Sequence, residues 1–112
     1  MAKDDFFRLV YYILLELYES KKQGCRVNID DISSATFGIP DSYWIDIMSE
    51  LKDNGYIKGV SIRKTKGIGR VINCDDIDIT MKGIEYLKEN SMMKKIKKAL
   101  KGLKDIVPVS LP

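Results

Sequence analysis

Apolar side chains between residues 4 and 22 recur with the spacing of one face of an α-helix. The members of this face are Phe6, Leu9, Val10, Ile13, Leu14 and Leu17. Acids at positions 4 and 5 suit the start of a helix, and Gly24 is a stop signal. Further apolar bulk lies on the other faces, at Phe7, Tyr11, Tyr12, Leu15 and Tyr18. We therefore expect other elements to pack around most of this helix.

The patterns of residues 25–54 predict three elements in turn: a strand, a short helix and a longer helix. Alternating apolar and polar residues at 25–29 predict a short half-buried strand. Asp30 is expected to cap a short second helix that ends at Phe37. Asp41 or Ser42 is expected to cap a third helix that runs to Asn54, where Asn54-Gly55 ends it. The i, i+3, i+4 and i+7 spacing predicts its buried face as Trp44, Ile47, Met48 and Leu51.

The second half of the chain begins with a β-hairpin pattern. Residues 56–63 and 70–74 are typical of strands, and the basic, glycine-rich residues 64–69 form the turn between them. An acidic loop with Asp75, Asp76 and Asp78 follows. Thr80 is expected to cap a fourth helix. A last amphipathic helix is predicted over residues 92–106, with a fraying tail beyond Pro108.

Two short helices joined by a tight turn and followed by a hairpin predict one fold class. It is α+β: a winged helix-turn-helix with an N-terminal helix and additional C-terminal helices. Residues 1–90 form the winged-helix domain. Residues 91–107 form a basic amphipathic helix packed on the domain or on a dimer partner, and residues 108–112 are a tail. The length of 112 residues suits a single domain.

Two segments resemble known winged-helix proteins. Residues 51–57 (LKDNGYI) resemble a common signature at the end of the third helix. Residues 79–90 (ITMKGIEYLKEN) resemble the Leu-Thr-x-x-Gly-x-x-Tyr-Leu segment that follows many wings. With the lysine-rich close ending LKDI, the chain from Asp4 to Val107 resembles the YjcQ family, small winged-helix proteins of Gram-positive bacteria and their phages. The resemblance implies this fold and a phage or prophage origin, and it brings no catalytic residues.

The amino-acid composition argues against several classes of catalytic and metal-binding function. The chain has no histidine, which removes the commonest general acid–base group and many nucleophile pairs. Two cysteines are too few for a disulfide scaffold or a four-thiolate zinc site. We expect no enzymatic activity, no catalytic residues, no cofactor and no metal. Without a signal-peptide pattern or a stretch of about 20 apolar residues, a cytoplasmic protein without a membrane partner is expected.

The net charge of +3 hides an asymmetry. Residues 1–57 carry six basic and ten acidic side chains, a net of −4, while residues 58–112 carry thirteen and six, a net of +7. No acid lies between positions 58 and 73. The candidate phosphate contacts of the wing are Arg63, Lys64, Lys66 and Arg70. The alternative is a solvated hairpin tip whose lysines prevent edge pairing.

The third helix argues against insertion into the DNA major groove. Its expected outward face carries Asp46 and Glu50 and no basic residue, whereas recognition helices normally present Arg or Lys. The candidate contacts with bases or backbone are Ser42, Tyr43 and Ser49. An exposed Tyr43–Ile45 pair would instead favour a protein partner, unless it packs on the first helix or the wing.

The last predicted helix has an apolar stripe opposite six lysines, of which Lys94 and Lys98 are candidate DNA contacts. Three interpretations compete. The helix folds back on the first helix, it pairs with a second copy to give a homodimer through the first and last helices, or it lies on an anionic membrane. We rank them in that order.

We expect no redox role for the two cysteines and no metal-binding role for the aspartates that follow the hairpin. Cys25 and Cys74 fall on strands that are commonly neighbours in a winged helix, and a reducing compartment favours two free thiols. The three aspartates at 75–78 lack the spacing of a calcium loop, so a solvated acidic turn is expected.

The sequence therefore predicts a small phage- or prophage-type protein that binds double-stranded DNA or regulates transcription through its wing and last helix. The alternative is a winged-helix adaptor for a protein partner that binds no DNA.

Overall fold

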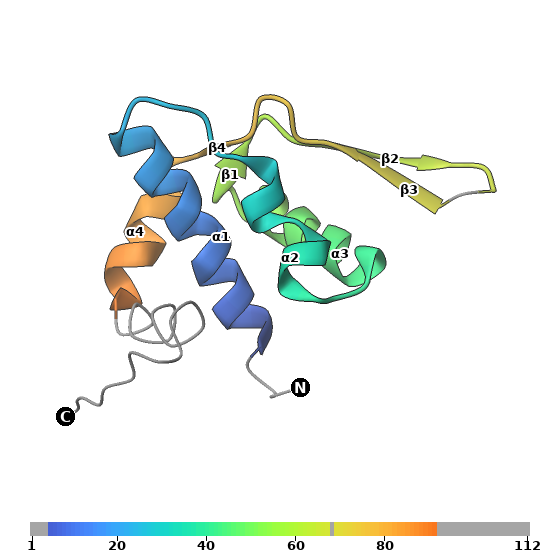
Figure 1. Cartoon of the computed structure of the whole chain (residues 1–112), viewed down its shortest axis with the longest axis horizontal. Helices are drawn as coiled ribbons and strands as arrows, with labels where there is room; N and C mark the ends of the chain where they lie inside the picture. Colours follow the sequence, from blue (N-terminus) through green and yellow to red (C-terminus); the bar gives the residue numbers. More distant parts are fainter. Residues whose placement is uncertain (1–4, 68, 92–112) are drawn as a thin grey trace.

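The structure is a computed structural model that describes residues 5–67 and 69–91. It confirms the α+β winged-helix class. In chain order the elements are α1 (Asp5–Lys22), the 3-10 turn η1 (Ile29–Ile32), α2 (Ser34–Phe37), α3 (Asp41–Asp53), β1 (Ile57–Lys58), β2 (Ser61–Thr65), β3 (Gly69–Asn73), β4 (Asp78–Ile79) and α4 (Met81–Glu89). The helices form a body, from which β2 and β3 project as a ribbon (Figure 1). The predicted last helix and tail lie outside the described residues.

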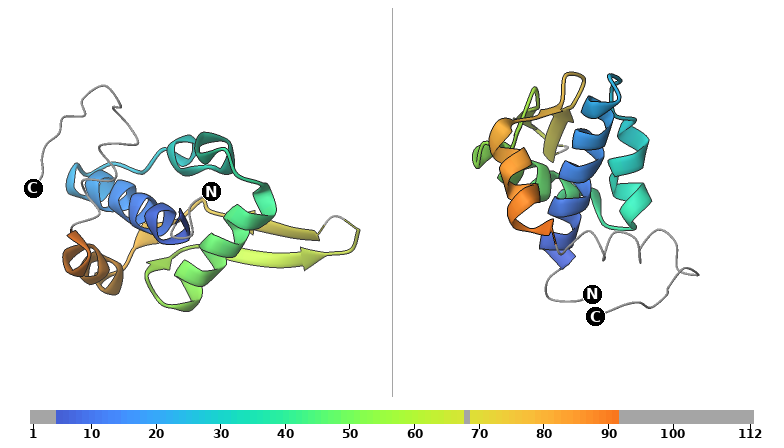
Figure 2. Two further views of the ribbon diagram at one scale, coloured as in Figure 1. Left: turned by 90° about the horizontal axis from the view of Figure 1, so that it is seen from below. Right: turned by 90° about the vertical axis from the view of Figure 1, so that its left-hand side faces the viewer.

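Helix α1 runs through the middle of the body, as Figure 2 shows in two further views. All its side chains from Leu9 to Leu15 are buried, none more than 9% exposed. The helix contacts α3, α4, β4 and η1. This agrees with the expectation that other elements cover most of its faces. Its C-terminal turn carries Lys21, whose Nζ lies 3.0 Å from Asp78 Oδ2 in β4.

The strand predicted at residues 25–29 is wrong. This segment joins no strand ladder and leads into η1 instead, where Asn28 Oδ1 accepts a hydrogen bond of 3.0 Å from the Asp30 amide. Arg26 donates to the Asp75 carbonyl at 3.0 Å. Val27 and Ile29 pack on the core. The alternating pattern therefore reflects side-chain packing without the backbone pairing of a strand.

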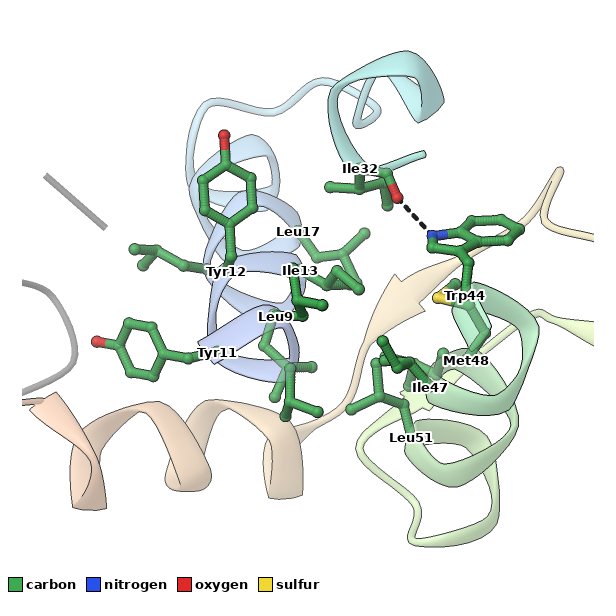
Figure 3. Packing of buried hydrophobic residues seen from close by; sticks show 14 of the residues in the cluster. Leu9, Tyr11, Tyr12, Ile13, Leu17, Ile32, Trp44, Ile47, Met48 and Leu51 are labelled. Atoms are coloured by element: carbon green, nitrogen blue, oxygen red, sulfur yellow. Dashed lines mark hydrogen bonds between the residues drawn. The ribbon is translucent and has the colours of Figure 1, made fainter. Parts of the chain in front are cut away.

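The predicted second helix is divided, and its cap is different. Ser33, not Asp30, caps α2 by accepting a hydrogen bond from the Thr36 amide. A buried hydrogen bond then fixes this region to α3: the Trp44 indole N–H donates to the Ile32 carbonyl at 2.7 Å (Figure 3). The helix-turn-helix pair is thereby held at a defined angle.

Helix α3 has the predicted buried face, with one addition. Its buried residues are Trp44, Ile45, Ile47, Met48 and Leu51. The predicted cap at Asp41 or Ser42 is wrong, because both lie inside the helix and the N-cap residue is Pro40, which has no side chain that can accept a hydrogen bond. Asn54 and Gly55, the latter at φ +78°, close it as expected. Figure 3 shows Ile47, Met48 and Leu51 on the side of α3 that faces α1.

The predicted strand 56–63 is split at Gly59, where the chain turns with φ +78°. β1 pairs antiparallel with β4, and β2 pairs antiparallel with β3 from Ser61 opposite Asn73 to Thr65 opposite Gly69. Asp78, predicted in a loop, belongs to β4. The body therefore keeps a short two-stranded ladder of its own, and the longer pair forms the wing.

Helix α4 begins as predicted, because the Thr80 side chain accepts a hydrogen bond from the Gly83 amide at 3.1 Å. Leu87 is buried, and Ile84 and Tyr86 pack against the core. Gly83 is itself buried where α4 crosses β1 and β4. The helix ends at Glu89, with Asn90 as its C-cap.

Candidate nucleic-acid interface

The wing carries three exposed cations at its outer end. Arg63, Lys64 and Lys66 are all exposed, and no acid lies in the described residues from 58 to 73. The ladder places Arg63 opposite Val71, and Lys64 opposite Arg70. Side chains alternate between the two faces of a strand, so the cations surround the ribbon. Three of the four predicted wing contacts are thus available to a polyanion.

Arg70 behaves differently from the other wing cations. Its Nη1 lies 2.8 Å from Asp46 Oδ1, and its Nη2 donates to the Ser42 carbonyl at 3.1 Å. Both partners belong to α3. Two of its five N–H donors therefore bind the body, while its predicted role as a phosphate contact stays a prediction. The pair leaves no local signal in the sequence, because its two charges lie 24 positions apart.

The two hairpin isoleucines explain which wing face turns toward the body. Ile62 and Ile72 are opposite each other in the ladder, half-buried, and packed against the core. Arg70 lies two positions from Ile72 and therefore shares its face. The base of the wing is anchored by this apolar pair, and Arg70 extends the contact to the N-terminal part of α3.

The predicted contact residues of α3 are scattered. Ser42 is exposed, but its carbonyl accepts from Arg70. Tyr43 is half-buried, with its ring 6.3 Å from that of Phe6. Ser49 is half-buried in the wall of a cleft. Ser42 therefore lies beside the wing, whereas Tyr43 and Ser49 are partly covered by the body.

The expectation of an exposed Tyr43–Ile45 pair is wrong. Ile45 is only 9% exposed and belongs to the core, and Tyr43 packs against Phe6 of α1. The sequence pattern predicts four buried positions on α3, and the packing of neighbouring elements adds a fifth. The pair therefore does not support a docking surface for a protein partner.

A cleft of about 460 Å³ lies beside the outward face of α3, between α1 and α4. Its walls combine polar and aromatic side chains and include Phe7, which is 54% exposed, and the mutually tilted rings of Tyr56 and Tyr86, whose centroids lie 5.1 Å apart. Burial, and to a smaller extent Tyr56, raises the pKa of Tyr86. Its described rim is acidic, with Asp46 and Glu50 and no basic side chain. Because Asp46 is paired with Arg70, Glu50 is the carboxylate of this rim without a described basic partner, and no cation of the described lining attracts phosphate.

Two aspartates of the predicted acidic loop, Asp75 and Asp78, have partners within the protein. Asp78 pairs with Lys21, and Asp75 Oδ2 accepts a 3.4 Å bond from Asn73. Burial acts to raise the pKa of Asp78, but the hydrogen bonds and charge of Lys21, with the Ile79 amide, lower it overall. Among residues 5–67 and 69–91, no three Cys, Asp or Glu side chains gather so that they can hold a metal ion.

The two cysteines are both free thiols in different surroundings. Cys25 is exposed, whereas burial and the charge of Asp75 raise the pKa of Cys74 to about 11. The hydrogen bond between Arg26 and Asp75 brings their two segments together. Only the thiolate is a good nucleophile, so the raised pKa suppresses reaction at Cys74.

Alkylation with iodoacetamide at pH 8 therefore has an expected order. Cys25 reacts first, and Cys74 reacts at least about tenfold more slowly, because a thiol with a pKa near 11 is only about 0.1% thiolate at this pH. Peptide mass spectrometry of timed samples measures both rates. The same reaction in 8 M urea is the control, in which the two rates converge. Equal rates in the folded protein contradict the prediction.

Lys94 and Lys98, the remaining predicted contacts, lie outside the described residues, as does the predicted homodimer contact through the last helix. Within the described ranges, none of the helices combines the length and the apolar character that crossing a bilayer requires.

A helix-turn-helix body with a projecting basic hairpin defines a winged-helix protein. Comparison with known families agrees, because a family model described as YjcQ protein matches residues 11–106. The chain belongs to the YjcQ family. A search of curated proteins gave no match, and a search of solved structures gave none.

Proposed function

We propose that this protein binds double-stranded DNA through its wing. The observation that carries the proposal is the exposure of Arg63, Lys64 and Lys66 on an acid-free ribbon that projects from the body (Figure 1). A two-stranded ribbon fits a DNA groove, and basic side chains on it neutralise phosphates and release counterions. The lysines of residues 94–104 come from the same basic half of the sequence and add to this charge.

The alternative explanation of the wing is a solvated tip, and its lysines would then serve only solubility. Two features favour binding. The acids of the chain all lie outside the wing, among them those on α3 and in the loop after β3, and Arg70 ties the wing to α3. A fixed, basic projection is pre-organised for a rigid polyanion, so less ordering entropy opposes binding.

The test is a fluorescence-anisotropy titration of the full chain with a labelled 20-base-pair duplex at 50 to 200 mM NaCl. We expect binding that weakens steeply with salt. In the triple variant R63A/K64A/K66A, affinity at 50 mM NaCl falls at least about tenfold. The slope of log K against log [salt] becomes shallower by about 0.9 for each phosphate that the variant no longer neutralises.

A control with the same charge change removes three lysines from other exposed sites, as K22A/K52A/K88A. We expect it to keep most of the affinity, because these lysines lie off the wing. No binding of the wild-type chain at 50 mM NaCl, or an equal fall in affinity in the two triple variants, would refute the proposal.

A further inference from the structure

Arg70 and Asp46 form an ion pair between the wing and α3, which we call the brace. This contact bears on which part of the protein can bind DNA. Arg70 holds two α3 groups at once, the Asp46 carboxylate at 2.8 Å and the Ser42 carbonyl at 3.1 Å. The Arg70 side chain is 30% exposed, and that of Asp46 is 58% exposed. A planar guanidinium with two simultaneous partners fixes direction as well as distance.

The brace leaves α3 poorly equipped to read bases. Arg70 is the wing cation that binds the N-terminal part of α3, where one donor on each of its Nη atoms has a partner. The described outward positions add the carboxylate of Glu50 and the half-buried Ser49, neither of which offers a cationic fork for guanine. Tyr43 is turned onto Phe6. Recognition of bases in the major groove would need cationic hydrogen-bond donors, which the described outward face of α3 does not present.

We propose that binding is led by the wing and is independent of DNA sequence, with Arg70 as a positioning residue that sets the wing and does not touch phosphate. This inference rests on the proposed function. The ligand is the backbone and minor groove of duplex DNA, which the wing cations contact, while the acidic face of α3 stays away from the phosphates.

The salt slope separates a positioning residue from one that binds phosphate. Lys64 is the matched control for Arg70, since it lies directly opposite in the ladder and no described partner holds it. We expect K64A to make the slope shallower by about 0.9, because the variant neutralises one phosphate fewer. R70A weakens binding about fivefold and leaves the slope unchanged, because it releases the wing while every phosphate stays neutralised. A slope change in R70A equal to that in K64A overturns the inference.

A second comparison uses the acidic partner. Asp46 and Glu50 are one turn apart on α3, and among the described residues only Asp46 pairs with Arg70. Both D46A and E50A remove one negative charge, which favours DNA. We expect E50A to bind DNA more tightly than D46A, and R70A to have little further effect in the D46A background. Equal affinities of D46A and E50A overturn the brace.

Sequence independence is tested with a pool of 20-base-pair duplexes that carry randomised cores, sequenced before and after selection by the full chain. We expect no sequence motif to be enriched more than tenfold in the selected pool. Sequence-specific DNA-binding proteins, by contrast, bind their sites about a thousandfold or more tightly than non-specific DNA. A motif enriched more than tenfold overturns the inference. Failure of the wild-type chain to bind any duplex would refute the proposed function itself. Enrichment of a motif, or a change of the salt slope in R70A, would overturn only the further inference.

Discussion

Replacement of Gly83 by alanine is expected to lower the free energy of unfolding by about 2–4 kcal/mol. A Cβ at this position would lie 2.4 Å from the Tyr56 carbonyl oxygen and 2.7 Å from Ile79 Cγ1. The nearer atom is backbone, so no side-chain rotation relieves the clash. Helix α4 would have to move away from the β1–β4 ladder, and the packing of Leu87 would suffer.

The sign of this change is diagnostic. Glycine inside a helix is less favourable than alanine by about 1 kcal/mol, so propensity alone predicts that G83A stabilises the protein. The structure predicts the opposite. Urea denaturation followed by tryptophan fluorescence measures the difference, with K88A on the exposed face of the same helix as a control expected within about 0.5 kcal/mol of wild type. A stabilised G83A would contradict the close crossing of α4.

Gly83 also shows why parts of the fold are open to prediction from sequence and others are not. The caps and periodic faces are local: Thr80 three residues before Gly83, or Trp44 and Ile47 three apart on α3, indicate their structure through spacing alone. The close approach at Gly83 has no local signal, because the carbonyl it faces belongs to Tyr56, far along the chain.

Two of the errors have the same origin. An alternating run at residues 25–29 predicts a strand only if a second strand is free to pair with it, and here β1 takes β4 as its partner. The spacing on α3 places Ile45 beside the regular apolar stripe and so predicts exposure, whereas tertiary packing buries it. Both of these errors concern partners distant in sequence, whereas the wrong cap of α2 is a local error, because Ser33 lies three residues from the expected Asp30.

The candidate interface divides in the same way. The basic, acid-free hairpin is visible in the sequence, and Arg63, Lys64 and Lys66 are exposed there as expected. The different role of Arg70 is not visible, since its partners Asp46 and Ser42 precede it by 24 and 28 positions. Spacing within the wing treats all four cations alike, and the pairing of β2 with β3 places Lys64 and Arg70 on one face. The difference comes from the contacts of Arg70 with Asp46 and Ser42 of α3.

Replacement of Gly59 by alanine is expected to lower the free energy of unfolding by about 3 kcal/mol or more. Gly59 lies between β1 and β2 at φ +78°, where an L-residue is strained. Its added Cβ would lie 1.9 Å from the Asp76 carbonyl oxygen and 2.5 Å from the carbonyl carbon. The two chain segments that leave the body for the wing therefore cross at a distance that only glycine permits.

A matched control separates backbone strain from the steric clash. Gly67, at the tip of the wing, has a similar φ of +87°, but an added Cβ there meets nothing within 4 Å. G67A should therefore cost only the left-handed strain, about 1 kcal/mol. In a chain of this size each 1 kcal/mol shifts the melting temperature by about 4–8 °C, so calorimetry distinguishes the two variants. Equal destabilisation would show that strain alone acts at both sites, whereas a much larger effect in G59A means that the crossing at Asp76 fixes where the wing leaves the body.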